Sequence, residues 1–221
     1  MRIGDELYNH ANEFTSPHYL MNDGRHGMIH RDTVTARGQM FAGIAKENPS
    51  KRCVFVGTMY HDIGHHIDPK KHEEISAQMC IDDKKLRKFF TKSQIIEISE
   101  GIADHRASLP GDPRNIIGKI ISSADRRVDM TDYLESTYTW RLKNASHMKL
   151  PEIIKDAFQY TCKKFGDDGY ANQKMYFLDL EYLAFQDEIK EMINDKKLFK
   201  SQYLKMVDNY HRQSELFSQV P

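Results

Sequence analysis

Along residues 30–48, apolar side chains keep to one face of a helix. This stripe consists of His30, Val34, Phe41, Ile44 and Ala45. Because the pattern stops before Asn48-Pro49, we expect the helix to end there, with His30 at the start of its buried face.

The next apolar run, CVFVGTMYHDIG over residues 53–64, is rich in β-branched and aromatic residues and fits either a buried strand or a buried helix. A strand here would have no other strands to pair with, since the surrounding segments have helical periodicity. We therefore predict a buried helix.

Two later segments carry a polar residue at the inner end of an apolar stripe. In residues 91–106, after Thr91 or Ser93 as a cap, the stripe holds Ile95, Ile98, Ile102 and His105. In residues 112–129, where Pro113 is placed to open a helix, it holds Ile117, Ile120, Ile121, Ala124 and Asp125. We expect His105 and Asp125 to face the interior.

Residues 150–165 and 173–193 are also predicted to be helical, separated by the turn-like GDDG. There is no internal repeat and no Pro/Gly/Ser-rich linker. The pattern predicts an all-α fold and a single domain over residues 1–221, with a core at about residues 20–130 and a helical extension at about 131–221.

Composition narrows the function classes. Lys plus Arg and Asp plus Glu both number 32, so there is no net field for general nucleic-acid or membrane binding. No run of about 18 apolar residues predicts a membrane span. Cys53, Cys80 and Cys162 lack disulfide or zinc-ribbon spacing, so we expect a reduced, cytoplasmic protein.

Four residues with metal-ligand chemistry fall on inward helix faces or helix ends: His30, His61, Asp62 and Asp125. Burying an unpaired carboxylate costs several kcal/mol, whereas two imidazoles and two carboxylates around one divalent ion satisfy one another. His61 and Asp62 point about 100° apart on an ideal helix, so both can contact one ion only near a helix end or with the ion placed between their two directions; Gly64 is consistent with a helix end.

The order His, then His-Asp in HDIG about thirty residues later, then a distant Asp resembles the HD superfamily of metal-dependent phosphohydrolases. The segments HEEISAQMC, ISEGIADHRAS and IISSADRRVD are similar to those of small stand-alone bacterial HD hydrolases. The resemblance implies a helical bundle and the metal ligands His30, His61, Asp62 and Asp125. Mn, Fe, Co, Ni, Zn and Mg are not distinguished, and a second ion is left open.

The resemblance also implies the reaction: hydrolysis of a phosphomonoester or phosphodiester of a nucleotide or other small metabolite by metal-activated water. Asp62 would orient or deprotonate the water, and His105 and His72 would hold the phosphate or donate a proton. Two alternatives stay open, a di-iron HD-type oxygenase and a non-catalytic, metal-stabilised sensing domain. Oligomerisation is also left open.

The remaining histidines give weaker signals. His65 and His66 follow a helix-breaking glycine, so we expect a solvated loop. The others lack a convincing face or partner and are expected on the surface: His10, His18, His26, His147 and His211. Arg106, Arg126 and Arg127 are candidates for phosphate contact, none of them favoured over the others.

Overall fold

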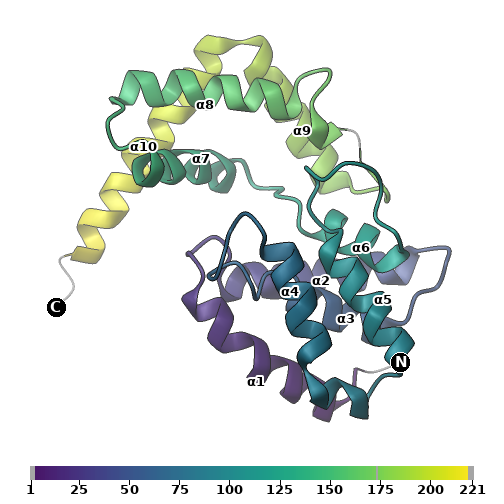
Figure 1. Cartoon of the computed structure of the whole chain (residues 1–221). Coiled ribbons are helices and arrows are strands. Elements are labelled where there is room, and N and C mark those ends of the chain that lie inside the picture. Colours follow the sequence, from purple (N-terminus) through teal and green to yellow (C-terminus); the bar gives the residue numbers. More distant parts are fainter. Residues whose placement is uncertain (1–2, 173, 219–221) are drawn as a thin grey trace. The chain divides into compact units, whose positions relative to one another are not determined.

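The computed structural model of the chain describes residues 3–172 and 174–218, and the regular structure in these ranges is entirely helical (Figure 1). The prediction of an all-α fold is therefore confirmed. The chain forms two compact units. The first contains the residues up to Arg126 together with Met175–Phe177, and the second contains Arg127–Lys174 and the residues from Leu178 onward. The prediction of a single domain stays a prediction.

The first unit contains six α-helices and one short 3-10 helix. They are α1 (Asp5–Met21), α2 (Met28–Ile44), α3 (Lys51–Tyr60), α4 (His72–Asp82), η1 (Lys84–Lys88), α5 (Lys92–Ala103) and α6 (Ile116–Ala124). Helix α3 packs against α1, α2, α5 and α6. Its residues Cys53–Tyr60 are consecutively buried, as expected for a helix surrounded by others. The prediction of a buried helix for this run is correct.

Close backbone contact joins the last turn of α5 to the first turn of α6. A Cβ atom on Gly101 would lie 2.9 Å from the backbone nitrogen of Gly118, so only glycine allows this approach. His105 follows the end of α5, and Asp125 follows the end of α6. The contact fixes the close packing of α5 against α6, the two helices that precede these residues.

Three helix boundaries differ from the sequence prediction or refine it. Thr91 caps α5 in a capping box with Gln94, as predicted. Helix α6 begins at Ile116 rather than at Pro113, because the side chain of Asn115 accepts the backbone N–H of Gly118 and caps the helix there. Helix α2 ends at Ile44, whose side chain is exposed and outside the buried stripe.

Residues 174–179 are not helical, contrary to the prediction for 173–193, while Gln173 lies outside the described residues. Part of this segment belongs to the first unit. The ring of Phe177 stacks on Phe41 with centroids 5.1 Å apart, and the Tyr176 hydroxyl donates to Asp112 over 2.9 Å. Packing of these aromatic side chains replaces the expected continuation of the helix.

The second unit has its own apolar core. Its helices are α7 (Met130–Asn144), α8 (Leu150–Phe165), η2 (Tyr170–Asn172), α9 (Leu180–Asn194) and α10 (Lys196–Ser218). Helix α10 packs against α7, α8 and α9. Buried aromatic residues form much of the core, including Tyr133, Phe165, Phe185, Phe199 and Tyr203. In the described part of the chain, no helix has the length and apolar character needed to cross a membrane.

Candidate metal centre

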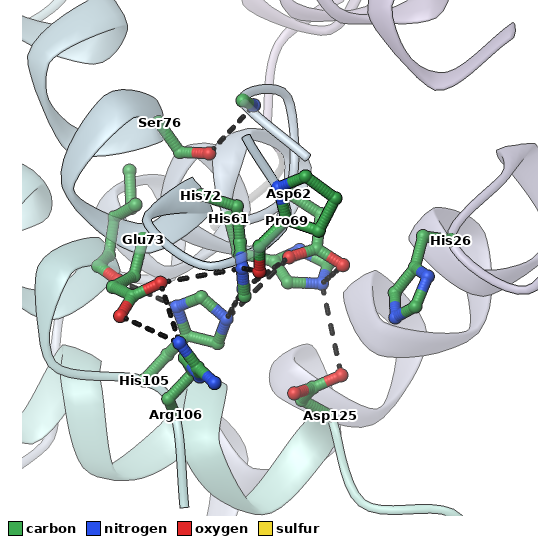
Figure 2. Close-up of polar contacts among 12 residues, drawn as sticks. His26, His61, Asp62, Pro69, His72, Glu73, Ser76, His105, Arg106 and Asp125 are labelled. Atoms are coloured by element: carbon green, nitrogen blue, oxygen red, sulfur yellow. Dashed lines mark hydrogen bonds and ion pairs between the residues drawn. The ribbon is translucent and has the colours of Figure 1, made fainter. Parts of the chain in front are cut away.

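The six residues predicted for the site lie together in the first unit. Figure 2 shows the arrangement of His61, Asp62, His72, His105 and Asp125. Each occupies a helix end or the turn that follows it. His30 is in the first turn of α2, His61 and Asp62 follow α3, His72 begins α4, His105 follows α5, and Asp125 follows α6. Because α3 ends at Tyr60, His61 and Asp62 lie in a turn and both face the site, which is the first of the two arrangements considered from the sequence.

Four ligand atoms form the first group, which we call the His30 set: Nε2 of His30, Nε2 of His61, Oδ1 of Asp125 and Oδ2 of Asp62. His30 Nε2 lies 3.1 Å from His61 Nε2, 3.2 Å from Asp125 Oδ1 and 3.3 Å from Asp62 Oδ2. His61 Nε2 lies 3.4 Å from Asp62 Oδ2 and 4.0 Å from Asp125 Oδ1. Ligands about 2.0–2.2 Å from a tetrahedral ion are about 3.3–3.6 Å apart. These separations fit one divalent ion.

The second group, the His72 set, uses the other oxygen of Asp62. His72 Nε2 lies 3.2 Å from Asp62 Oδ1, and His105 Nε2 lies 3.6 Å from the same oxygen. The two Nε2 atoms are 3.4 Å apart. Asp62 is thus shared between the sets, one oxygen in each.

Backbone carbonyl groups fix the tautomers of three histidines. Each Nδ1 lies within hydrogen-bond distance of a carbonyl oxygen: His61 of Thr58 (2.7 Å), His72 of Pro69 (3.0 Å) and His105 of Ile102 (2.6 Å). Because a carbonyl oxygen only accepts, each Nδ1 carries the proton. In the neutral ring Nε2 then holds a lone pair, as metal ligation requires.

One carboxylate oxygen of the site lacks a hydrogen-bond partner in the described part of the chain, and a bound cation would supply one. Asp62 Oδ1 is buried, yet among the described residues it accepts no hydrogen bond. The nearby Nε2 atoms of His72 and His105 are also acceptors in this tautomer. Several acceptors facing one another without a donor are unfavourable unless a proton or a metal ion lies between them. The side chains present therefore fit a divalent ion in each set.

The two carboxylates remain ionised in these surroundings. Burial raises the pKa of Asp62, but the imidazoles of His61, His105 and His30 outweigh it and hold the pKa well below its usual range. Burial also raises the pKa of Asp125, and the hydrogen bond from His30 outweighs it in the same way. The site therefore supplies negative charge at neutral pH.

The imidazoles of the His30 set differ from each other. Burial lowers the pKa of His61 to about 4, so this ring is neutral at pH 7. Burial also acts to lower the pKa of His30, but its contacts with Asp125 and Asp62 raise it to about 10. A proton on His30 and a metal ion are thus alternative partners for the two carboxylates.

Residues of α1 and the following loop support the His-Asp pair. The Tyr19 hydroxyl lies 3.1 Å from His61 Nδ1 and accepts the backbone N–H of Asp62 over 3.3 Å. The Asn22 amide donates to the Asp62 carbonyl oxygen over 3.0 Å. Tyr19 could not be identified from the sequence, because an aromatic residue in a helical stripe is most often only part of a core.

Several histidines expected on the surface are not there. His65 is 8% exposed, and its ring stacks on that of His26 with centroids 3.9 Å apart. His10 is buried and its Nε2 lies 2.6 Å from Asp83, and His18 Nδ1 is 3.0 Å from His66 Nε2. These corrections share one cause: the contacts join α1 and loops to distant parts of the chain, where no periodicity reports burial.

Asp23 and His26 also lie beside the site, although His26 was expected on the surface and Asp23 was not predicted as a site residue. The available signal was their Asp-x-x-His spacing, in which His26 lies four positions before His30, as is typical of a pair of metal ligands. Of the three candidate arginines, Arg106 donates to Glu73 and to the Lys70 carbonyl oxygen, and Arg127 pairs with Asp132.

Comparison with known proteins gives one positive result. Residues 29–134 match the model of the HD domain, and this range includes His30, His61, Asp62, His72, His105 and Asp125. No significant match was found among curated proteins or among solved structures. HD domains bind divalent metals and are typical of metal-dependent hydrolases. The match and the all-α first unit agree that this chain contains an HD domain.

Proposed function

We propose that the protein is a metal-dependent phosphohydrolase that cleaves a phosphomonoester or phosphodiester bond in a small phosphorylated metabolite, including a nucleotide. The observation that carries the proposal is the sharing of Asp62 by two sets of ligand atoms with metal-like separations. Each set suits one divalent ion. The HD-domain match supports the same class of chemistry.

In this proposal the His30 set holds one ion and the His72 set holds a second. Bound divalent ions supply water that ionises near neutral pH and positive charge that offsets charge on a phosphoryl oxygen. The short distances from His72 and His105 to Asp62 Oδ1 favour metal ligation over the direct phosphate contact that the sequence suggested.

The protein's own residues prepare this centre. The carbonyl groups of Thr58, Pro69 and Ile102 hold the imidazoles with Nε2 toward the site. Tyr19 and Asn22 fix the backbone at Asp62. Rigid, correctly oriented ligands reduce the reorganisation needed during reaction.

Differences in exposure indicate the side from which a substrate enters. The side chains of His61, Asp62 and His105 are at most 3% exposed, whereas those of His30 and Asp125 are 18% and 29% exposed. The centre is therefore reached past His30 and Asp125. A phosphate group at the end of a small molecule fits this approach.

The test is release of p-nitrophenol from p-nitrophenyl phosphate and from its bis-ester, followed by phosphate release from a panel of nucleotides and sugar phosphates. EDTA-treated protein is reloaded separately with Mn, Co, Ni, Fe, Zn or Mg. We expect activity with at least one metal and none in Asp62→Ala. Hydrolysis by the EDTA-treated protein or by Asp62→Ala at the rate of the metal-loaded protein would exclude the proposal.

The shared carboxylate also supports a second candidate, oxidation by a pair of iron ions. Four imidazoles and two carboxylates in two adjoining sets suit redox metals as well as zinc or manganese. Metal dependence distinguishes the phosphohydrolase from the di-iron oxygenase. An oxygenase consumes oxygen with iron alone and releases no phosphate, whereas a hydrolase works without oxygen and accepts redox-inactive ions.

A further inference from the structure

A third group of potential ligands lies beside the centre and is used by neither set. Asp23, His26 and His65 each offer one ligand atom, and these atoms all lie within 4.8 Å of one another. We call this group the His26 set. It adjoins both other sets: the His26 ring is 5.7 Å from that of His30, and the His65 ring is 5.4 Å from that of His72.

His65 is the buried member of this group. Its side chain makes no hydrogen bond to any described residue, although the residue is only 8% exposed. Its ring contacts are with other imidazoles, His26 and His72. No donor or acceptor of the described residues therefore occupies its ring nitrogens, and a nitrogen lone pair remains available to a bound cation.

Asp23 orients the second imidazole. His26 Nδ1 lies 2.8 Å from Asp23 Oδ1, and the backbone N–H groups of Arg25 and His26 also donate to that oxygen. A carboxylate that accepts Nδ1–H leaves the His26 Nε2 lone pair free, an arrangement common for metal-binding histidines. Figure 2 shows His26 on the same side of Asp62 as Asp125.

We propose that Asp23, His26 and His65 form an additional divalent-cation site next to the HD centre. His26 and His65 supply imidazole nitrogens, and Asp23 supplies either its second oxygen or the orientation of His26. Asp23 and His26 have side chains 35% and 26% exposed, so both can rotate toward an ion without disturbing the core.

This ion is expected to bind more weakly than those of the other sets. The His26 set has one carboxylate, and that group is partly exposed to solvent. Cations in the neighbouring sets would also repel another cation a few ångströms away. Sequential loading therefore follows, with the His26 set filled last.

The experiment is a zinc titration of the EDTA-treated full chain, followed by anomalous diffraction from zinc-soaked crystals. We expect a weak binding step and an anomalous peak beside His26 and His65. His65→Ala should bind one ion fewer per chain, so that the weak step and the peak beside His26 disappear. The peaks at the other two sets should remain. Asp23→Asn changes a more exposed residue and should weaken the same step at least several-fold.

His66→Ala is the matched control, because His66 neighbours His65 but pairs with His18 outside the set. It should bind as many ions as the unchanged protein. The proposal is overturned if folded protein shows no peak at the His26 set, if the peak persists in His65→Ala, or if His65→Ala loses the ions of the other sets instead. The readout is metal content and position, so it does not depend on phosphohydrolase activity.

Discussion

Asp62 is the residue on which both the His30 set and the His72 set depend. Its two oxygens face different imidazoles, so Asp62→Ala should remove the ions of both sets together with activity.

His105→Ala removes a ligand from the His72 set alone and should cost one ion, with turnover reduced by roughly 10²-fold or more. Metal analysis of dialysed, folded variants checks both expectations. Equal metal content in the two variants would contradict the shared role of Asp62.

Tyr19 acts on the centre from outside the ligand sets. Tyr19→Phe deletes the hydroxyl that accepts the Asp62 N–H and leaves this buried donor without that partner. Loss of such a supporting contact typically lowers metal affinity by about 10–100-fold. Competition with a chromophoric chelator measures the change. Tyr8→Phe, on the same helix but half exposed, is the control and should leave the affinity unchanged.

Two buried imidazoles make the stability of the metal-free protein sensitive to acid. Burial lowers the pKa of both His61 and His65 to about 4, below the value near 6.5 in an unfolded chain. Between these values only the unfolded state binds the protons, so stability falls as pH falls from 6.5 toward 4. Each group contributes up to about 1.4 kcal/mol per pH unit.

Urea unfolding in EDTA at pH 6.5, 5.8 and 5.0 measures this dependence. His30 acts in the opposite direction near pH 6.5, because its folded pKa of about 10 keeps it protonated in the folded state while the unfolded state still gains its proton; this contribution fades as the pH falls toward 5. His65→Gln should make the dependence shallower, and His147→Gln, at an exposed position, should not. An identical slope in His65→Gln would show that His65 does not titrate as described.

At the scale of single residues, the sequence predicted the site residues that belong to a motif or to a helical stripe. His30, His61, Asp62 and Asp125 were chosen for their spacing and burial, and the structure brings them together. His26 and His65 could not be found in this way. They lie in turns, where burial depends on how distant segments meet and leaves no periodic trace in the sequence.

At the scale of elements, the turn between α3 and α4 sets the position of His72. The Gly64 N–H donates to Ser76 Oγ of α4 over 2.9 Å. A Cβ atom at Gly64 would lie 2.8 Å from Ile75 Cβ and 2.9 Å from the His72 carbonyl oxygen, so α4 would have to move. Gly64→Ala should destabilise the protein by about 1–3 kcal/mol and weaken the ion of the His72 set.

Gly43→Ala is a matched substitution with the opposite expectation. Gly43 lies within α2, and an added Cβ would meet only the end of the Lys51 side chain, 3.9 Å away. Removing a helical glycine there should stabilise the protein by about 0.5–1 kcal/mol. Thermal unfolding and metal titration of both variants separate a local backbone effect from displacement of α4. Equal effects of the two substitutions would contradict this account.

Helical periodicity identified most elements of the first unit, but less of their ends. Local capping determines the start of α6: the helix begins after the capping residue Asn115 and not at Pro113. Tertiary packing keeps residues 174–179 out of a helix, because Phe177 stacks on Phe41. Such contacts between residues far apart in sequence are invisible to a pattern read over a short window.

At the scale of the whole molecule, the open question is whether the two compact units unfold together. The prediction of a single domain rested on the absence of a linker, and a short connection permits either answer. The proposed metal ligands all belong to the first unit, while Trp140, the only tryptophan of the chain, belongs to α7 of the second. Metal binding and tryptophan fluorescence therefore report different units.

If the chain is one cooperative domain, an ion bound in the first unit must stabilise the surroundings of Trp140. A ligand at about 100 times its Kd contributes about 2.7 kcal/mol, which for a chain of this size raises the midpoint of thermal unfolding by roughly 5–10 °C. We expect the transition followed by Trp140 fluorescence to shift by this amount on adding metal, and Asp62→Ala to abolish the shift. A Trp140 transition that does not move, while far-UV circular dichroism records a metal-stabilised one, would show two independent domains. Cooperativity is the appropriate criterion here, because the length of a linker limits how two units can move but does not determine whether their free energies of unfolding are coupled.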